Sequence, residues 1–259
     1  MRCSIVQYTK QHAECIGLAV EFLLNKYKCN QIDVLVYEKD NLGKEWFEFF
    51  KINYKGIVKL DKITEITGVY DTMFFLTSSD YILNSGSHNA FGLVHQADKI
   101  INCKEFRNLS ICPFIGGCEL IPFNFRFMLN KYPKSLFYSD IDFFVTGWQE
   151  HLDLDTLNDL LKKLDIKCLY ISKRYETHKS YSNLIFCERI TTMGLIDCFL
   201  HKTCIFIPKM DGVYMNERIS GCIHLCYSFG TTLFLPYKCK ENYPKCANFI
   251  GYDKIYEIL

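Results

Sequence analysis

Proline and long apolar runs are both scarce in this sequence of 259 residues. Six prolines stand against 21 phenylalanines and 17 tyrosines, a balance that favours ordered, strand-rich structure over extended loops. No stretch approaches the roughly 18–20 uninterrupted apolar residues of a membrane-spanning helix, so we expect no membrane span. Residues 1–8 lack the charged segment and long apolar run of a secretory signal.

An excess of charge of either sign is also missing. Lys and Arg total 30 and Asp and Glu total 29, which leaves a formal net charge of +1. Proteins that bind nucleic acid by neutralising phosphates usually carry a basic excess, so we expect no nucleic-acid partner. Apolar residues at 49% and charged residues at 23% exclude a disordered or fibrous chain.

Fourteen cysteines are present, but the chain is long enough to build a core without disulfides. With no secretory signal in view, we expect the cysteines to act as small buried apolar residues in a reducing compartment. The predicted location is cytoplasmic.

Short apolar runs alternate with stretches whose apolar residues recur every three to four positions, the pattern of α/β proteins. Runs that are apolar throughout are typical of parallel sheets covered on both faces. The predicted strands are residues 4–8, 33–37, 56–60, 72–77, 90–96, 143–147, 168–172, 184–187, 203–207 and 232–235. The predicted helices are residues 16–27, 44–50, 154–164, 193–200 and 220–230.

The alternation restarts after a polar break at residues 130–135. The sequence therefore predicts two Rossmann-like doubly wound domains facing each other across a cleft. We place them at residues 1–132 and 133–259, with ligands beyond the carboxyl ends of the strands.

The most informative segment is residues 204–230. A strand ends at Pro208, a polar loop follows, and Ser220-Gly221 opens a helix that closes at Gly230. Ser220 is a favourable N-cap residue, and Gly221 lets a ligand approach the backbone. The exposed amides and the positive end of a helix dipole suit a diphosphate, and Arg218 adds a cation beside them.

The segment from Leu195 to Pro236 resembles the donor-binding half of GT-B glycosyltransferases. The likeness lies in Ile207-Pro208, Tyr214, Ser220-Gly221, Ser228-Phe229-Gly230 and the strand ending at Pro236. It implies two Rossmann-like domains, a nucleoside-diphosphate sugar as donor, and transfer of the sugar to a glycan or other hydroxyl acceptor. It implies no cofactor and no metal.

The resemblance also implies roles for single residues. Glu217 matches the first of two glutamates found in the retaining branch and would bind donor hydroxyls, but Leu225 stands in the place of the second, which leaves the stereochemical outcome open. Gly147 ends the first strand of the donor half. Arg174 would replace the basic residues that often follow that glycine.

His95 follows the predicted strand 90–96 of the first half, which resembles the family's strand ending in His-Asp or His-Glu on the acceptor side. His95 would act as a base or as a hydrogen-bond donor to sugar or phosphate. The chain is short for two such domains, which leaves pairing into a homo-oligomer open.

Three alternatives remain at this point. Asp140 and Asp142 form an Asp-x-Asp pair of the kind that holds a divalent metal in GT-A glycosyltransferases. Residues 217–221 resemble the Arg-x-His-Gly element of polysaccharide pyruvyl transferases, with Ser220 in place of His. The missing second glutamate and the missing basic pair after Gly147 are also compatible with a non-catalytic module, a decayed transferase that binds nucleotide-sugar or a partner. A zinc site at Cys222 and Cys226 is disfavoured, because both fit the buried face of the helix.

Overall fold

The computed structural model describes most of the chain as two compact units, Met1–Phe123 and Asn124–Leu259. The described residues are 1–7, 12–36, 41–54, 59–63, 69–81, 89–110, 115–121, 138–172, 180–188, 190–215, 217, 220–236, 239 and 249–251. The predicted boundary between residues 132 and 133 falls outside them and stays a prediction, as does a cleft between the domains.

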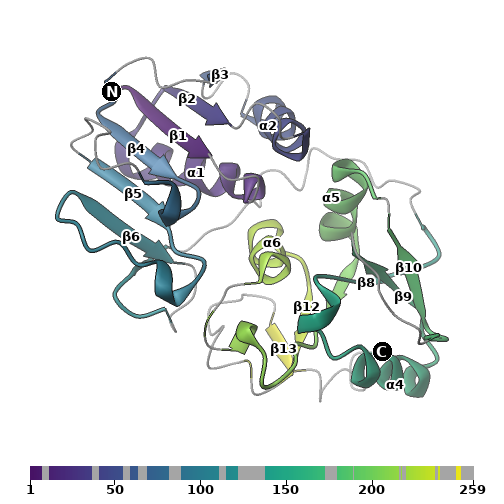
Figure 1. Cartoon of the computed structure of the whole chain (residues 1–259). Helices are drawn as coiled ribbons and strands as arrows, with labels where there is room; N and C mark the ends of the chain where they lie inside the picture. The colour runs from purple at the N-terminus through teal and green to yellow at the C-terminus, as the bar shows by residue number, and fades with distance from the viewer. Residues whose placement is uncertain are drawn as a thin grey trace. The chain divides into compact units, whose positions relative to one another are not determined.

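The first unit contains a parallel sheet in the order β3–β2–β1–β4–β5–β6–β7 (Figure 1). Its strands are β1 (Cys3–Gln7), β2 (Gln31–Val36), β3 (Lys59–Ile63), β4 (Thr72–Phe75), β5 (Asn89–Leu93), β6 (Phe106–Ser110) and β7 (Glu119–Leu120), and its helices are α1 (Ile16–Tyr27) and α2 (Asn41–Asn53). The first six positions follow the strand order of the Rossmann fold, in which the order reverses between β1 and β4.

Apolar side chains cover both faces of this sheet. On one face, the Phe22 ring of α1 packs against Phe74 and Phe91, at centroid distances of 5.3 and 5.0 Å. On the other face, a cluster that includes Val6 and Phe75 is packed against Tyr81, Ile101 and Cys103. Burial on both sides explains why the strands of this sheet are apolar throughout rather than alternating.

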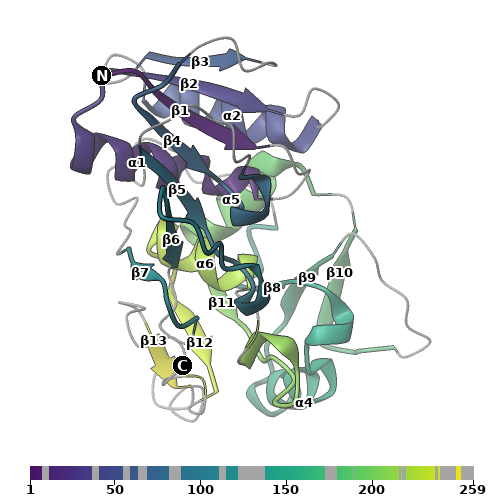
Figure 2. The same ribbon diagram turned by 60° about the vertical axis from the view of Figure 1, so that its left-hand side comes forward.

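The second unit repeats the strand order, as β10–β9–β8–β11–β12–β13. Its strands are β8 (Phe143–Thr146), β9 (Cys168–Ile171), β10 (Leu184–Cys187), β11 (Thr203–Ile205), β12 (Leu233–Leu235) and β13 (Phe249–Gly251), and its helices are α4 (Leu154–Leu164), α5 (Thr192–His201) and α6 (Gly221–Phe229). Figure 2 shows β11, β8, β9 and β10 side by side. Here the order reverses between β8 and β11.

Local signals start and stop the helices of the second unit. Asp153 caps α4 by accepting a hydrogen bond from the Thr156 amide, and Thr191 caps α5 through the Gly194 amide. Gly230 ends α6 with a φ of 66°, a left-handed conformation that glycine adopts without strain. The Phe199 ring of α5 stacks with Phe229 of α6, so these two helices lie on one face of the sheet.

Most of the predicted elements are present, and the α/β class with two doubly wound parallel sheets is confirmed. The predicted strand 56–60 is displaced, because β3 begins at Lys59 and residues 55–58 lie outside the described part. Strands β6, β7 and β13 were not predicted. Within the described residues, no helix combines the length and the apolar character needed to cross a membrane.

The cysteines follow the expectation with one correction. Cys3 and Cys29 form a disulfide that ties the start of β1 to the segment before β2. Ten further described cysteines are not part of a disulfide, and eight of those ten are buried, as expected for small apolar residues.

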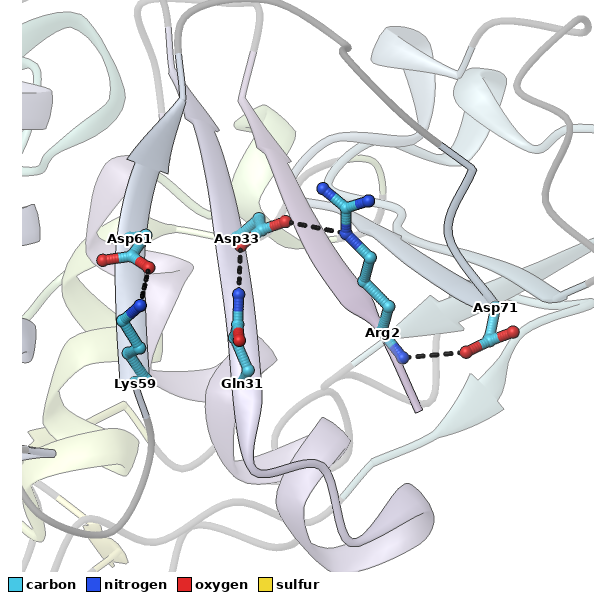
Figure 3. A network of polar contacts seen from close by, with 6 residues as sticks. All are labelled: Arg2, Gln31, Asp33, Lys59, Asp61 and Asp71. Carbon is cyan, nitrogen blue, oxygen red and sulfur yellow. Dashed lines mark hydrogen bonds and ion pairs between the residues drawn. The ribbon is translucent and has the colours of Figure 1, made fainter.

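A polar network lies at the amino ends of the first unit's strands (Figure 3). Asp33, which is 2% exposed, accepts hydrogen bonds from Arg2 Nε and Gln31 Nε2, both at 3.3 Å. The Arg2 amide donates to Asp71 at 2.8 Å. The network therefore joins β1, β2 and the residue before β4.

Replacing the buried carboxylate should cost more stability than replacing an exposed one. Asp33→Ala leaves two donors without their acceptor, so we expect the free energy of unfolding to fall by about 1–3 kcal/mol. Asp61→Ala, which removes the more exposed pair with Lys59, should cost at most about 1 kcal/mol. Urea unfolding of both variants measures the difference, and equal losses would contradict the role given to Asp33.

Candidate functional site

The carboxyl edge of the second sheet is the first candidate site. Strands β8 and β11 are adjacent, and the chain leaves them in opposite directions, β8 toward β9 and β11 toward β12. Loops that diverge at such a reversal open a crevice at the carboxyl edge of an open α/β sheet. The residues that follow these two strands are therefore the ones to compare with the predicted donor site.

Backbone contacts hold the two loops together. The Lys209 amide donates to the His151 carbonyl at 3.0 Å, and the Asp153 amide donates to the Ile207 carbonyl at 2.9 Å. Leu152 and Pro208 form an isolated antiparallel bridge between these bonds. These contacts therefore fix the loop after β8 against the loop after β11.

Gly147 and Tyr214, both predicted donor residues, come together in this structure. The half-buried Tyr214 ring lies 5.0 Å from the His151 ring and 6.0 Å from Phe206, measured between centroids. Gly147 follows β8 directly, and a Cβ placed on it would lie 3.6 Å from the Phe206 ring. His151 was not predicted, although it stands four residues after Gly147.

The amino end of α6 lies next to the end of β8, close to Gly147. Ser220 is the N-cap residue of α6 and is 2% exposed, and its side chain makes no capping hydrogen bond. Cys222, one residue into the helix, takes a hydrogen bond from the Thr146 backbone at the end of β8. Ser220 and Gly221 therefore lie beside the strand end that leads into Gly147.

The structure describes only some of the other residues predicted for this half. Glu217 is exposed, and its amide donates to the Val213 carbonyl at 3.0 Å. Arg174 and Arg218 lie outside the described residues, so their roles stay predictions. Asp140 and Asp142 are exposed and precede β8, which places them at the edge of the sheet opposite to the one where α/β sheets bind ligands.

The carboxyl edge of the first sheet carries a second group of side chains. His12 follows β1 in a left-handed conformation with φ of 67°, and His95 follows β5. Their rings stack with centroids 3.7 Å apart and planes 9° from parallel. The Cys15 sulfur and one nitrogen of each ring lie within 4.8 Å of one another.

Hydrogen bonds assign the protons on the two imidazoles. His95 Nε2 lies 2.8 Å from the Leu76 carbonyl oxygen, which can only accept, so Nε2 carries the hydrogen. His12 Nδ1 lies 3.3 Å from Glu14 Oε1. A carboxylate that receives the Nδ1 hydrogen leaves Nε2 as the basic nitrogen of His12, the arrangement of an oriented general base.

Cys15 and its neighbours do not suit nucleophilic or metal chemistry. Burial first, and the charge of Glu14 second, raise the pKa of the Cys15 thiol well above its ordinary value, so the thiol stays neutral and weakly nucleophilic. A metal binds imidazole through the nitrogen lone pair in the ring plane. Two rings stacked face to face cannot both direct that lone pair at one ion.

The sequence did not single out His12, although His12, like His95, follows the carboxyl end of a strand. It lies beyond the carboxyl end of the first strand, next to the reversal of strand order. Because 82 residues lie between His12 and His95, nothing local in the sequence indicates their contact.

Comparison with known proteins adds no family assignment. No protein-family model matches the chain, and no curated protein matches it in sequence. Escherichia coli heptosyltransferase WaaC with ADP aligns with a TM-score of 0.44 at 10% identity, over 92% of this chain and 87% of that one. A family 9 glycosyl transferase from Veillonella parvula aligns with a TM-score of 0.47 at 12% identity, over 99% and 90%.

Both structural neighbours are described as glycosyltransferases. Because both TM-scores lie below 0.5, the fold assignment rests on the strand orders of this chain. Those orders define two Rossmann-type units, each with a group of candidate site residues at its carboxyl edge.

Gly147 has a φ of 151°, which strains any other residue. We expect Gly147→Ala to lower the free energy of unfolding by about 1–3 kcal/mol, because alanine would have to adopt this strained backbone conformation. Steric clash adds little, since an added Cβ meets neighbouring side chains only at ordinary contact distances. Gly116→Ala is the matched control, since a Cβ there has open space around it. Thermal unfolding should separate the two, and an unaffected Gly147→Ala would remove the conformational reason for this glycine.

Proposed function

We propose that the chain is a glycosyltransferase that moves a sugar from a nucleoside-diphosphate sugar to a hydroxyl acceptor. The observation that carries the proposal is the docking of the first turn of α6 against the end of β8, where the strand order reverses. It is supported by the resemblance of residues 195–236 to GT-B donor-binding halves. The proposed location is the cytoplasm.

The second unit holds the donor in this proposal. The backbone amides at Ser220 and Gly221 bind the diphosphate at the positive end of the helix dipole. Arg218 and Arg174 supply cations, Tyr214 and Gly147 shape the loop, and Glu217 binds donor hydroxyls. These amides stabilise the charge that develops on the leaving diphosphate, and fixed dipoles of this kind commonly give the largest catalytic contribution.

The first unit supplies the acceptor chemistry. His12, oriented by Glu14, takes the proton from the attacking hydroxyl through Nε2. His95 donates to the Leu76 carbonyl and packs on the His12 ring, so it serves to position the base. The proposal thus gives His95 a positioning role, whereas the sequence predicts that it acts as a base or as a hydrogen-bond donor to sugar or phosphate.

Donor binding should depend on the start of α6. We expect Arg218→Ala to weaken binding of the preferred nucleoside diphosphate by about 10–100-fold, the range of a charge-assisted hydrogen bond. Ser220→Ala should weaken it less. Thr191→Ala is the matched control, because it removes the cap of α5 without touching the reversal of strand order.

Thermal shift with a panel of nucleoside diphosphates measures these affinities, since a ligand that binds the folded state raises its melting temperature. A wild-type protein that no nucleotide stabilises would refute the donor site. Nucleotide binding without transfer to any acceptor would instead favour the non-catalytic module.

Transfer should depend on His12 more than on His95. We expect His12→Gln to lower kcat by about 10²–10⁴-fold, the usual contribution of a general base, with donor affinity unchanged. His95→Gln should lower kcat less, because this residue only positions the base, and a reversed order of the two effects would return the base to His95.

A further inference from the structure

Three cysteines of the second unit meet where α6 packs on β11. Cys204 lies in β11, and Cys222 and Cys226 are four positions apart on one face of α6, so both point to the strand. All three are buried, at 0%, 5% and 1% exposure. Their sulfur atoms lie within 4.8 Å of one another, with Cys204 and Cys222 at 3.5 Å.

These separations suit a shared metal ion. A metal–sulfur bond of about 2.3 Å places two sulfur ligands about 3.8 Å apart in a tetrahedral site and about 4.0 Å apart in a trigonal one. The sulfur–sulfur distances in this triangle, one of 3.5 Å and none above 4.8 Å, lie in a range that includes both values.

Sulfur chemistry and ligand number select the kind of ion. Thiolates favour soft ions such as copper(I) and zinc. Structural zinc takes four protein ligands. Among the described His, Cys, Asp and Glu side chains, the group at this place consists of the three cysteine sulfurs. We propose that Cys204, Cys222 and Cys226 form a three-coordinate site for a thiophilic metal ion, with copper(I) as the preferred ion.

Metal binding displaces the protons of these thiols, because a cysteine binds a metal as its thiolate. Each sulfur that binds the ion as a thiolate releases one proton to solvent, and no electron is transferred.

The bound ion would tie three elements together. It would link the first two turns of α6 to β11, and through the Thr146 contact to the end of β8. The inference rests on the sulfur geometry alone and stands whether or not the chain transfers sugars.

Anaerobic titration of the reduced, full-length protein with copper(I), in competition with a coloured copper(I) chelator, tests the site. We expect one ion per chain, and a loss of at least 100-fold in affinity in Cys222→Ser and in Cys226→Ser. Cys187→Ser is the matched control, because it also replaces a buried thiol of this unit and should bind as the wild type does. X-ray absorption at the copper edge should show a shell of three sulfurs.

Thermal unfolding provides a second readout that does not involve activity. Copper(I) should raise the melting temperature of the wild type and of Cys187→Ser but not of Cys226→Ser. Wild-type affinity no higher than that of Cys222→Ser would overturn the proposal. So would a Cys204–Cys222 disulfide in the purified protein whose reduction restores no copper binding.

Discussion

The parallel pairing of β8 with β11 is the constraint on which the second unit depends. The two strands share only a short register, Phe143 with Thr203 and Phe144 with Cys204, yet they are separated along the chain by α4, β9, β10 and α5. Because the order reverses at this pair, the loops beyond it diverge and α6 starts beside them. Without the pairing, Gly147, Tyr214 and Ser220 would belong to unrelated loops.

The same strand order supports different chemistry in the two units. In the second unit, the carboxyl edge of the sheet carries a glycine, an aromatic pair and the start of a helix, which suit an anionic ligand. In the first unit, the carboxyl edge carries two stacked imidazoles and a carboxylate, which suit proton transfer. The fold fixes where the chemistry occurs, and the side chains at that edge decide which chemistry it is.

Sequence patterns identified the elements whose side chains are uniformly buried or strictly periodic. β4 and β9 are apolar runs, and α4 repeats leucine with helical spacing, so each carries its own signal. β6 does not, because its sequence Phe-Arg-Asn-Leu-Ser mixes buried and exposed positions, and β7 has two residues. The predicted donor residues follow from local motifs, whereas the His12–His95 contact and the sulfur triangle arise only when distant segments meet.

The departure from the retaining pattern at Leu225 has a physical explanation in α6. Leu225 is 6% exposed and lies in the same helix as Cys222 and Cys226, whose side chains pack into the unit. A glutamate at a position so shielded from water would lose its hydration without a matched partner. Leucine therefore fits the packing of this helix, whereas Glu217 in the loop before α6 is exposed to solvent. In the proposed donor site, recognition therefore depends more on backbone amides than on a pair of carboxylates.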